Sequence, residues 1–432
     1  MHSCYYKMSK KITNPEMVFF HKLLFSAPQI QILPLSWHSY IQKQTHVNVC
    51  MKWKKDSYFD SIDSIHKSLQ LKPIISMKNF FLSSSSSPHD NYCIPISAVS
   101  KKGLNFGLNI RVARFLRSYP SFFEEFTGPL YNLPWFRLTQ KAIELNKEER
   151  MIYENFKDDI MGRLKKLILM SGGRKVIPLK VIKGLHWYLG LPDEFWEDPS
   201  DFVKDSECFR IVDIEDGLKG LAVFEGNDDN KDGKFWSQMQ KTAMKKGLYN
   251  GGADEAIAFP LFPSKGLRLK QKINDWLNEF QCLPYVSPYD DFSFLKPDSD
   301  LSEKRVVGLL HELLSLFVEH AAERKAFLCL RKCLCLPQKI HKAFERHPHM
   351  FYLSMKNKTC TVILKEAYGN ELTIEPHPLA EVRKKYIDLM KESVVILRNK
   401  KLNGRRAFDE EKFSLENMDG IDEVIGTNRQ YA

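Results

Sequence analysis

The middle of the chain alternates between two patterns of apolar and polar residues. In some stretches, apolar residues recur every three or four positions, which predicts amphipathic helices. Between these stretches lie short, mostly apolar runs arranged in pairs around a turn sequence, which predicts β-hairpins. The predicted hairpins join residues 122–126 to 135–138, 209–212 to 218–224, and 351–354 to 361–364. The turn Glu215-Asp216-Gly217 in the second pair is a strong hairpin signal.

The hairpins belong to three degenerate copies of one unit, which a comparison of the chain with itself brings out. Ile94-Pro95-Ile96 aligns with Ile177-Pro178-Leu179, and the same shift sets Gly107-Leu108 on Gly190-Leu191 without a gap. A second shift, also without a gap, sets Leu108-Asn109 on Leu336-Pro337, Tyr119-Pro120 on His347-Pro348, and Phe123 on Phe351. Regular self-similarity of this kind predicts structural repeats, at about residues 90–145, 175–225 and 325–368.

Each copy has the same order of predicted elements: a helix, a short Gly-Leu or Leu-Pro turn, a second helix that ends at a proline, and a hairpin. This order predicts an α+β fold that is mainly α-helical and consists of three winged-helix-like repeats. Between the second and third repeats, Asp300 and Glu303 resemble the start of a long capped helix. A fold class does not determine function, so the functional prediction depends on particular residues.

The helix before each hairpin is informative because that helix commonly faces nucleic acid in winged-helix folds. In copy one, Val112, Phe115, Leu116 and Tyr119 form an apolar face, while Arg111, Arg114 and Arg117 point elsewhere. In copy three, the apolar face is Ile340, Ala343, Phe344 and His347, and the basic residues are Lys339, Lys342 and Arg346. We therefore predict that both helices bind nucleic-acid phosphates. The alternative, that they are ordinary solvated faces, stays open.

The corresponding positions of copy two are acidic. Glu194 and Glu197 align with Arg111 and Arg114, so this copy should repel phosphate there. An acidic face is compatible instead with a role in binding other proteins.

Two further segments are candidate nucleic-acid contacts. Lys356 and Lys358 lie in the turn of the third hairpin. Arg268, Lys270 and Lys272 precede Trp276, Phe280, Tyr285 and Tyr289, and such mixing of basic and aromatic residues suits backbone neutralisation together with base stacking. The alternative is that these rings hold the repeats together.

The charge of the chain is concentrated at its start. The formal net charge is +11, and residues 1–55, with eight lysines and only Glu16 as an acid, carry +7 of it. A basic, acid-poor segment with amphipathic stretches predicts an organelle transit peptide, and a retained basic arm is the alternative. We expect a mitochondrial address, with the chloroplast as the alternative because the segment lacks arginine. At the other end, residues 396–432 are highly charged. This composition predicts a disordered tail.

The sequence contains no recognisable catalytic, nucleotide-binding or metal-binding motif. His311-Glu312 lacks the second histidine of a zinc protease motif, because position 315 is serine. Cys329, Cys333 and Cys335 alternate with leucines and have no C-x-x-C spacing, so we expect core cysteines in place of a zinc site. We therefore expect no enzyme activity, no cofactor, no metal, no small-molecule substrate and no membrane span.

Several segments resemble the plant organelle RNA recognition family over residues 56–395, and in particular the mitochondrial members of its What's This Factor group. They are Trp276 to Tyr289, Pro297 to Asp300, Glu303 to Leu316, Leu191-Pro192, Arg346 to Tyr352, and Leu364 to Tyr368. The resemblance implies binding of group II intron RNA, promotion of splicing in an organelle, and no catalytic residues. Two alternatives remain: a helical-repeat scaffold that joins other splicing factors, and a nucleic-acid binder like the mitochondrial transcription termination factors, which should lack hairpins.

Overall fold

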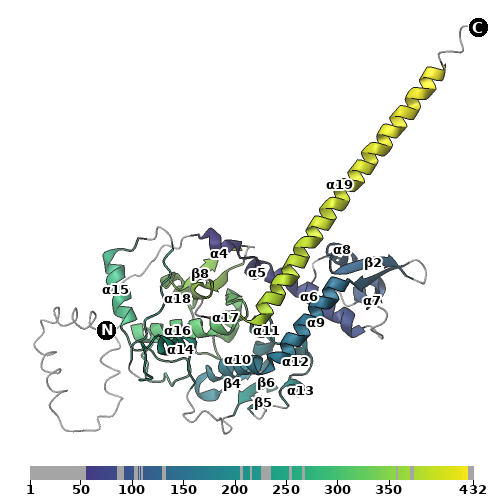
Figure 1. Cartoon of the computed structure of the whole chain (residues 1–432). Coiled ribbons are helices and arrows are strands. Elements are labelled where there is room, and N and C mark those ends of the chain that lie inside the picture. Colours follow the sequence, from purple (N-terminus) through teal and green to yellow (C-terminus); the bar gives the residue numbers. More distant parts are fainter. Residues whose placement is uncertain are drawn as a thin grey trace, which may run out of the picture.

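A computed structural model describes residues 55–426 apart from several short segments. These segments are 85–91, 102–105, 107, 109, 129–132, 205–207, 215–216, 225–234, 253–254, 265–267, 357–358 and 370–373. The side chains of residue 196 and of residues 404–426 are also left out of the description. The chain is mainly helical, with three small antiparallel sheets (Figure 1).

The three predicted repeats share one order of elements and one sheet topology. The first contains β1 (Ile94–Pro95), α7 (Ile96–Lys101), α8 (Val112–Arg117), β2 (Phe123–Thr127) and β3 (Pro134–Leu138). The second contains β4 (Val176–Pro178), α11 (Leu179–Leu189), α12 (Asp193–Glu197), α13 (Pro199–Val203), β5 (Phe209–Asp213) and β6 (Lys219–Val223). The third contains β7 (Ala321–Glu323), α17 (Arg324–Leu330), α18 (His341–Arg346), β8 (Phe351–Ser354) and β9 (Thr361–Leu364). The strand orders are β1-β3-β2, β4-β6-β5 and β7-β9-β8.

The hairpin predictions are confirmed, and each sheet has one strand more than we predicted. The added strand precedes the first helix of its unit and pairs with the second strand of the hairpin, as Ile177 does with Leu221. The aligned segments Ile94-Pro95 and Ile177-Pro178 form this strand in the first two copies. It is only two or three residues long, so it has no alternating pattern of its own to predict it.

Other helices join and cover the units. They are α4 (Ser57–Ser61), α5 (Asp63–His66), α6 (Ser68–Ser84), α9 (Gln140–Asn155), α10 (Lys157–Leu169), α14 (Gln238–Lys245), α15 (Gln271–Gln281), α16 (Asp300–Leu316) and α19 (Pro378–Gly426). Short 3-10 turns occur at Gly172–Arg174 and Lys365–Tyr368.

Helix α16 lies in the core, and nearly all of its residues are buried. Several of its buried polar residues have partners from distant parts of the chain, as expected of polar groups in a core. Glu312 accepts hydrogen bonds from the hydroxyl of Tyr289 at 2.6 Å and from the backbone N–H of Gln238 at 2.6 Å. The cap of this helix is Ser299, whose hydroxyl oxygen accepts from the N–H of Ser302, so the predicted cap at Asp300 is wrong by one residue.

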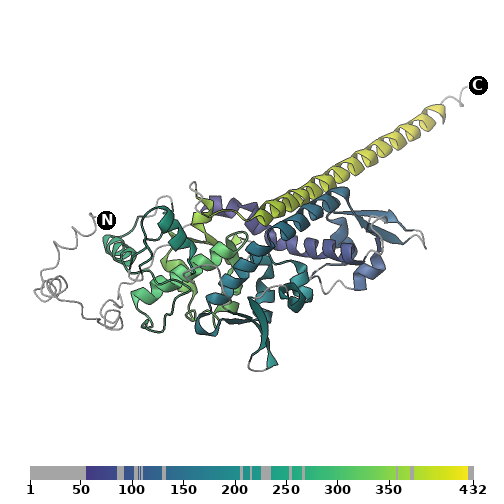
Figure 2. The same cartoon turned by 60° about the horizontal axis from the view of Figure 1, so that its bottom comes forward.

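The first part of α19 ties the three units together. It packs against α9, α5 and α6 (Figures 1 and 2). Arg383 of this helix forms an ion pair with Glu319, just before β7, and donates to the carbonyl of Trp187 in α11. Tyr386 stacks on Phe122 beside β2 with ring centroids 6.1 Å apart. One helix thus contacts elements of all three repeats.

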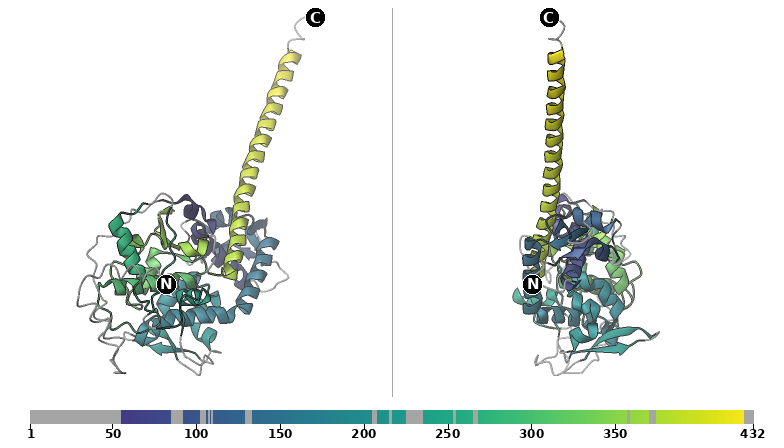
Figure 3. Two further views of the ribbon diagram at one scale, coloured as in Figure 1. Left: turned by 60° about the vertical axis from the view of Figure 1, so that its left-hand side comes forward. Right: turned by 90° about the vertical axis from the view of Figure 1, so that its right-hand side faces the viewer.

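Beyond the body, α19 continues as a single helix that stands away from the rest of the protein (Figure 3). At 1.5 Å per residue, its full length is about 70 Å. The last segment, which we predicted to be disordered, is therefore helical as far as Gly426. Among the described helices, α19 included, none is both long and apolar enough to cross a bilayer.

The turn at Gly190 gives a test of the second unit. Gly190 ends α11 with φ of +72°, and a Cβ atom there would lie 2.8 Å from Val318 and 2.9 Å from Leu379. We expect Gly190→Ala to lower the free energy of unfolding by about 1–3 kcal/mol, because alanine adds both backbone strain and overpacking. Urea denaturation measures this change.

Gly184 provides the matched control in the same helix. It lies inside α11, and nothing would come within 4 Å of an added Cβ. Gly184→Ala should stabilise the protein by about 0.5–1 kcal/mol, because alanine is the better helix former. Equal shifts in urea midpoint for the two variants would contradict this account of Gly190.

Candidate nucleic-acid interface

Helix α8 presents arginines to solvent, as predicted. Val112, Phe115 and Leu116 are buried against the core of the first unit, which fixes the orientation of the helix. Arg111 and Arg114 are exposed and have no carboxylate partner among the described residues. Exposed cations without a partner are suited to binding phosphate, since no existing ion pair has to break first.

Arg117 differs from the other two arginines of α8. Its guanidinium forms two hydrogen bonds with the Glu125 carboxylate of β2, at 2.7 and 2.5 Å. These bonds raise the pKa of Arg117. Both side chains are exposed, so the pair is weak, but it partly neutralises Arg117.

Helix α18 repeats the arrangement in the third unit. Ile340, Ala343 and Phe344 are buried, which confirms the predicted apolar face. Lys339 and Lys342 are exposed, and neither pairs with a carboxylate in the part of the chain that the structure describes. The two helices therefore share a pair of free cations at aligned positions.

Arg346 has a different position from the one the helix pattern suggested. Its guanidinium forms an ion pair with Glu303 of α16 at 2.7 Å and lies over the Trp276 ring, 5.3 Å from the centroid. His347 bonds to the same Glu303 carboxylate at 3.0 Å. Arg346 thus holds α18 to α15 and α16, and its charge is already compensated.

The second unit has the predicted acidic face. Glu194 and Glu197 of α12 are both exposed. Next to them, Asp193 accepts a hydrogen bond from the side chain of Asn79. This surface is unfavourable for phosphate, so the second unit differs from the other two in the charge of this helix.

The remaining basic candidates lie around α15 and the third hairpin. Arg268, Lys270 and Lys272 are exposed near the start of α15. Lys356 is exposed but donates to the carbonyl of Asp60 at 2.7 Å, and Lys358 lies outside the described residues.

Three aromatic residues in α15 and just after it are part of the core. Trp276, Phe280 and Tyr285 are at most 3% exposed, so their rings are not available for stacking on bases. Trp276 and Phe280 both pack on His347 of the third unit, with centroids 5.7 and 4.9 Å away. The alternative prediction, that these rings hold the structure together, is confirmed for the three of them.

The two free basic pairs are far apart. Helices α8 and α18 lie toward opposite ends of the body, with the first part of α19 between them (Figures 1 and 2). The structure therefore does not bring all the predicted basic residues into one site. An RNA that contacts both pairs has to extend across the body.

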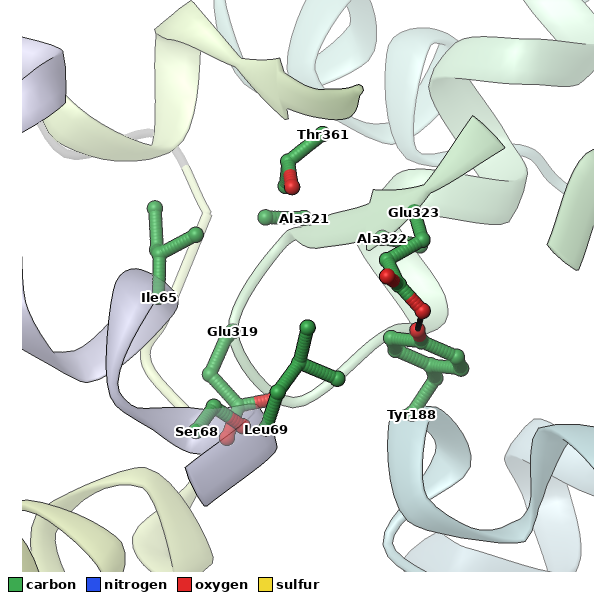
Figure 4. Close-up of a pocket in the computed structure, with 9 residues that line it drawn as sticks. All are labelled: Ile65, Ser68, Leu69, Tyr188, Glu319, Ala321, Ala322, Glu323 and Thr361. Carbon is green, nitrogen blue, oxygen red and sulfur yellow. Dashed lines mark hydrogen bonds between the residues drawn. The ribbon is translucent and has the colours of Figure 1, made fainter. Parts of the chain in front are cut away.

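A small pocket lies between the second and third units. Glu319 and Glu323 line it, and the hydroxyl of Tyr188 bonds to Glu323 at 3.4 Å (Figure 4). Both carboxylates already have cationic partners, Glu319 in Arg383 at 2.5 Å and Glu323 in Lys325 at 2.6 Å. Within the described residues, no group of three or more histidine, cysteine or acidic side chains is placed to hold a metal ion.

The cysteine prediction is wrong for two of the three residues. Cys329 and Cys335 are exposed and Cys333 is half-buried, while Leu330, Leu334 and Leu336 are buried. Cys329 lies on the outer face of α17, and Cys335, at φ of +51°, lies in the turn between α17 and α18. Leu330, Leu334 and Leu336 point inward in their place.

Comparison with known proteins identifies the class. The chain belongs to the plant organelle RNA recognition domain family, whose model matches residues 54–395. It is 58% identical over 360 residues to Protein WHAT'S THIS FACTOR 9, mitochondrial, of Arabidopsis thaliana, which covers 83% of this chain and 90% of the relative.

More distant relatives are also similar over most of the chain. Protein WHAT'S THIS FACTOR 1 homolog, chloroplastic, of Arabidopsis thaliana is 28% identical, covering 87% of this chain and 69% of the relative. Protein ROOT PRIMORDIUM DEFECTIVE 1 of the same plant is 26% identical, covering 88% and 91%. No solved structure matches the chain.

Proposed function

We propose that the protein is a mitochondrial RNA-binding protein that binds group II intron RNA and promotes its splicing. The observation that carries the proposal is the pair of free cations on α8, repeated on α18, in a chain of an RNA recognition family. It is not an enzyme: its contribution is to bind and shape RNA, with no group of its own that reacts.

The units support this function because they are winged-helix-like. The first and third units have two helices before the hairpin wing, and the second has three. In each, the second helix corresponds to the one that faces nucleic acid in winged-helix proteins. Arg111 and Arg114, and Lys339 and Lys342, lie on or next to that helix. The hairpins also argue against a purely helical repeat like that of the transcription termination factors.

A scaffold that joins other splicing factors is the second candidate. The exposed Glu194 and Glu197 of α12 favour it, because this face repels RNA and is open to a basic protein partner. The two functions are compatible if the first and third units bind RNA and the second binds protein.

The proposal is tested with protein recovered from isolated mitochondria. Sequencing of the RNA that co-purifies with a tagged chain should show enrichment of group II introns over exons of the same transcripts. Plants without the protein should accumulate the same introns unspliced. Enrichment of no intron, or normal splicing of the enriched ones, would reject the function.

The same material tests the proposed targeting to mitochondria. The mature N-terminus, read by mass spectrometry, should lie near residue 55, since the family match begins at residue 54 and residues 1–55 carry the expected transit peptide. Recovery of peptides from the first 50 residues would show that this segment is retained.

A further inference from the structure

The C-terminal helix leaves the body beside the first unit. Ser121, just before β2, donates from its hydroxyl to the carbonyl of Leu389 at 2.5 Å, and its N–H donates to the Ser393 hydroxyl at 3.2 Å. Ser121 and Ser393 are both buried. Helix α19 is therefore fixed to the segment that joins α8 to β2, and its exposed part starts there (Figure 3).

The exposed part begins with a basic stretch. No acidic residue occurs between Glu392 and Asp409 in the sequence. Arg398, Lys400 and Lys401 are exposed, and none forms an ion pair with a described carboxylate. Arg398 and Lys401, three residues apart, are neighbours on the helix surface. A stretch without acids attracts a polyanion more strongly than a surface of mixed charge.

Helical geometry places one residue of this stretch, Lys400, on the side of the first unit. Lys400 is seven residues after Ser393, about two turns, so it lies on the face that contacts the first unit. The pKa of Glu125 in β2 is lowered mainly by its hydrogen bond with Arg117 and also by the charge of Lys400. Lys400 of α19 and Arg117 of α8 thus both lie near Glu125. Lys401 is turned about 100° and Arg398 about 160° away from Lys400 around the helix.

We propose that Arg398, Lys400 and Lys401 of α19 bind phosphates of the RNA that contacts Arg111 and Arg114 of α8. Lys400 lies nearest the first unit, and the RNA backbone passes around the helix to Lys401 and Arg398. This inference rests on the proposed function and adds a second element to the RNA contact of the first unit. These side chains bind the sugar-phosphate backbone of intron RNA without reading bases, since they offer only charged donors.

The test is a triple variant, Arg398→Gln with Lys400→Gln and Lys401→Gln. It is made in the mature protein, residues 56–432. Each single-stranded phosphate contact contributes about 0.7 to the slope of log affinity against log salt concentration, so the slope should fall by about 2. Glutamine is a good helix former, so circular dichroism should be unchanged. An unchanged salt slope, with the wild type bound to the intron RNA, overturns the proposal.

A matched control removes the same charge elsewhere. Lys241 and Lys245 in α14, together with Lys246, are exposed and lie away from α8 (Figure 1). Changing these three residues to glutamine should leave the slope within about 0.5 of wild type, because they make no specific phosphate contact. An equal fall in both triple variants means a general effect of net charge and also overturns the proposal.

Two other results separate the possible failures. If the wild type itself does not bind intron RNA, the proposed function is rejected, and the role of α19 is rejected with it. The exposed Val394, Val395 and Leu402 on the same stretch also suit a protein partner. If the triple variant keeps its RNA affinity and salt slope but loses a co-purifying protein, the stretch is a protein-binding surface and the RNA assignment is wrong.

Discussion

Changing Arg111, Arg114, Lys339 and Lys342 together to glutamine will weaken the dependence of intron binding on salt. The slope of log affinity against log salt concentration should fall by about 2.8, counting about 0.7 for each lost phosphate contact. At 0.15 M salt this corresponds to a loss of affinity of roughly two orders of magnitude. Each pair changed alone should reduce the slope by about 1.4. Filter binding of a group II intron RNA at a series of salt concentrations measures both quantities.

The structure makes this prediction specific to charge. The four side chains are exposed and without a carboxylate partner among the described residues, so glutamine breaks no ion pair that holds the fold. Val112 and Phe344, which anchor the two helices in the core, are untouched. Surface substitutions of this kind change the free energy of unfolding by at most about 0.5 kcal/mol, so the melting temperature should barely move.

The acidic helix provides the control. Glu194→Gln with Glu197→Gln alters the aligned positions of the second unit and should leave the affinity equal or slightly higher. If the fourfold variant keeps the affinity and salt slope of the wild type, α8 and α18 are ordinary solvated faces. The RNA surface would then have to include Arg268, Lys270 and Lys272, the exposed cations near the start of α15.

Much of the fold could be predicted because local patterns determine it. The runs Phe351-Tyr352-Leu353-Ser354 and Thr361-Val362-Ile363-Leu364 correspond to β8 and β9 without any shift. The alignment of Phe123 with Phe351 predicted that β2 and β8 start at equivalent positions, and they do. The first strand of each sheet was not predictable in the same way. It is only two or three residues long, and it is a strand because it pairs with a strand distant in the sequence, not because of a pattern within it.

The candidate site could be predicted only as far as helix periodicity extends. Periodicity separates Arg111 and Arg114 from the buried face of α8, and the structure agrees. It gives no sign that Glu303 approaches Arg346, because these residues are far apart in the sequence and meet only when α16 packs on α18. For the same reason, the sequence gives no sign that the basic stretch of α19 lies near the first unit. The hydrogen bond between Ser121 and Ser393 shows this position.

The sequence favoured a disordered tail, whereas the structure has residues 396–426 in α19. Charge density favours disorder, but residues 396–426 contain no proline and many good helix formers, and they continue a helix that is already anchored. Helix propagation adds one hydrogen bond per residue and avoids the cost of a new nucleus. The packing of Arg383 and Tyr386 on the body supplies that nucleus, which composition alone does not show.

Arg383→Met will lower the free energy of unfolding by about 3–5 kcal/mol, because it leaves the Glu319 carboxylate buried without its ion pair. Arg383 donates to Glu319 at 2.5 Å and to the Trp187 carbonyl at 2.7 Å, and its guanidinium lies 3.9 Å from the centre of the Trp187 ring. One substitution thus weakens the contacts of α19 with the second and third units. In a thermal scan, the melting temperature should fall by about 6–10 °C.

Lys385 supplies the matched control on the same helix. It pairs with Glu148, but both side chains are largely exposed, so Lys385→Met should cost at most about 1 kcal/mol. Adding Glu319→Gln to Arg383→Met should recover part of the loss, because it removes the unpaired buried charge. If Arg383→Met and Lys385→Met melt at the same temperature, the buried pair does not fasten α19. The helix would then be held by its apolar contacts around Tyr386, and its position beside the first unit would not depend on Arg383.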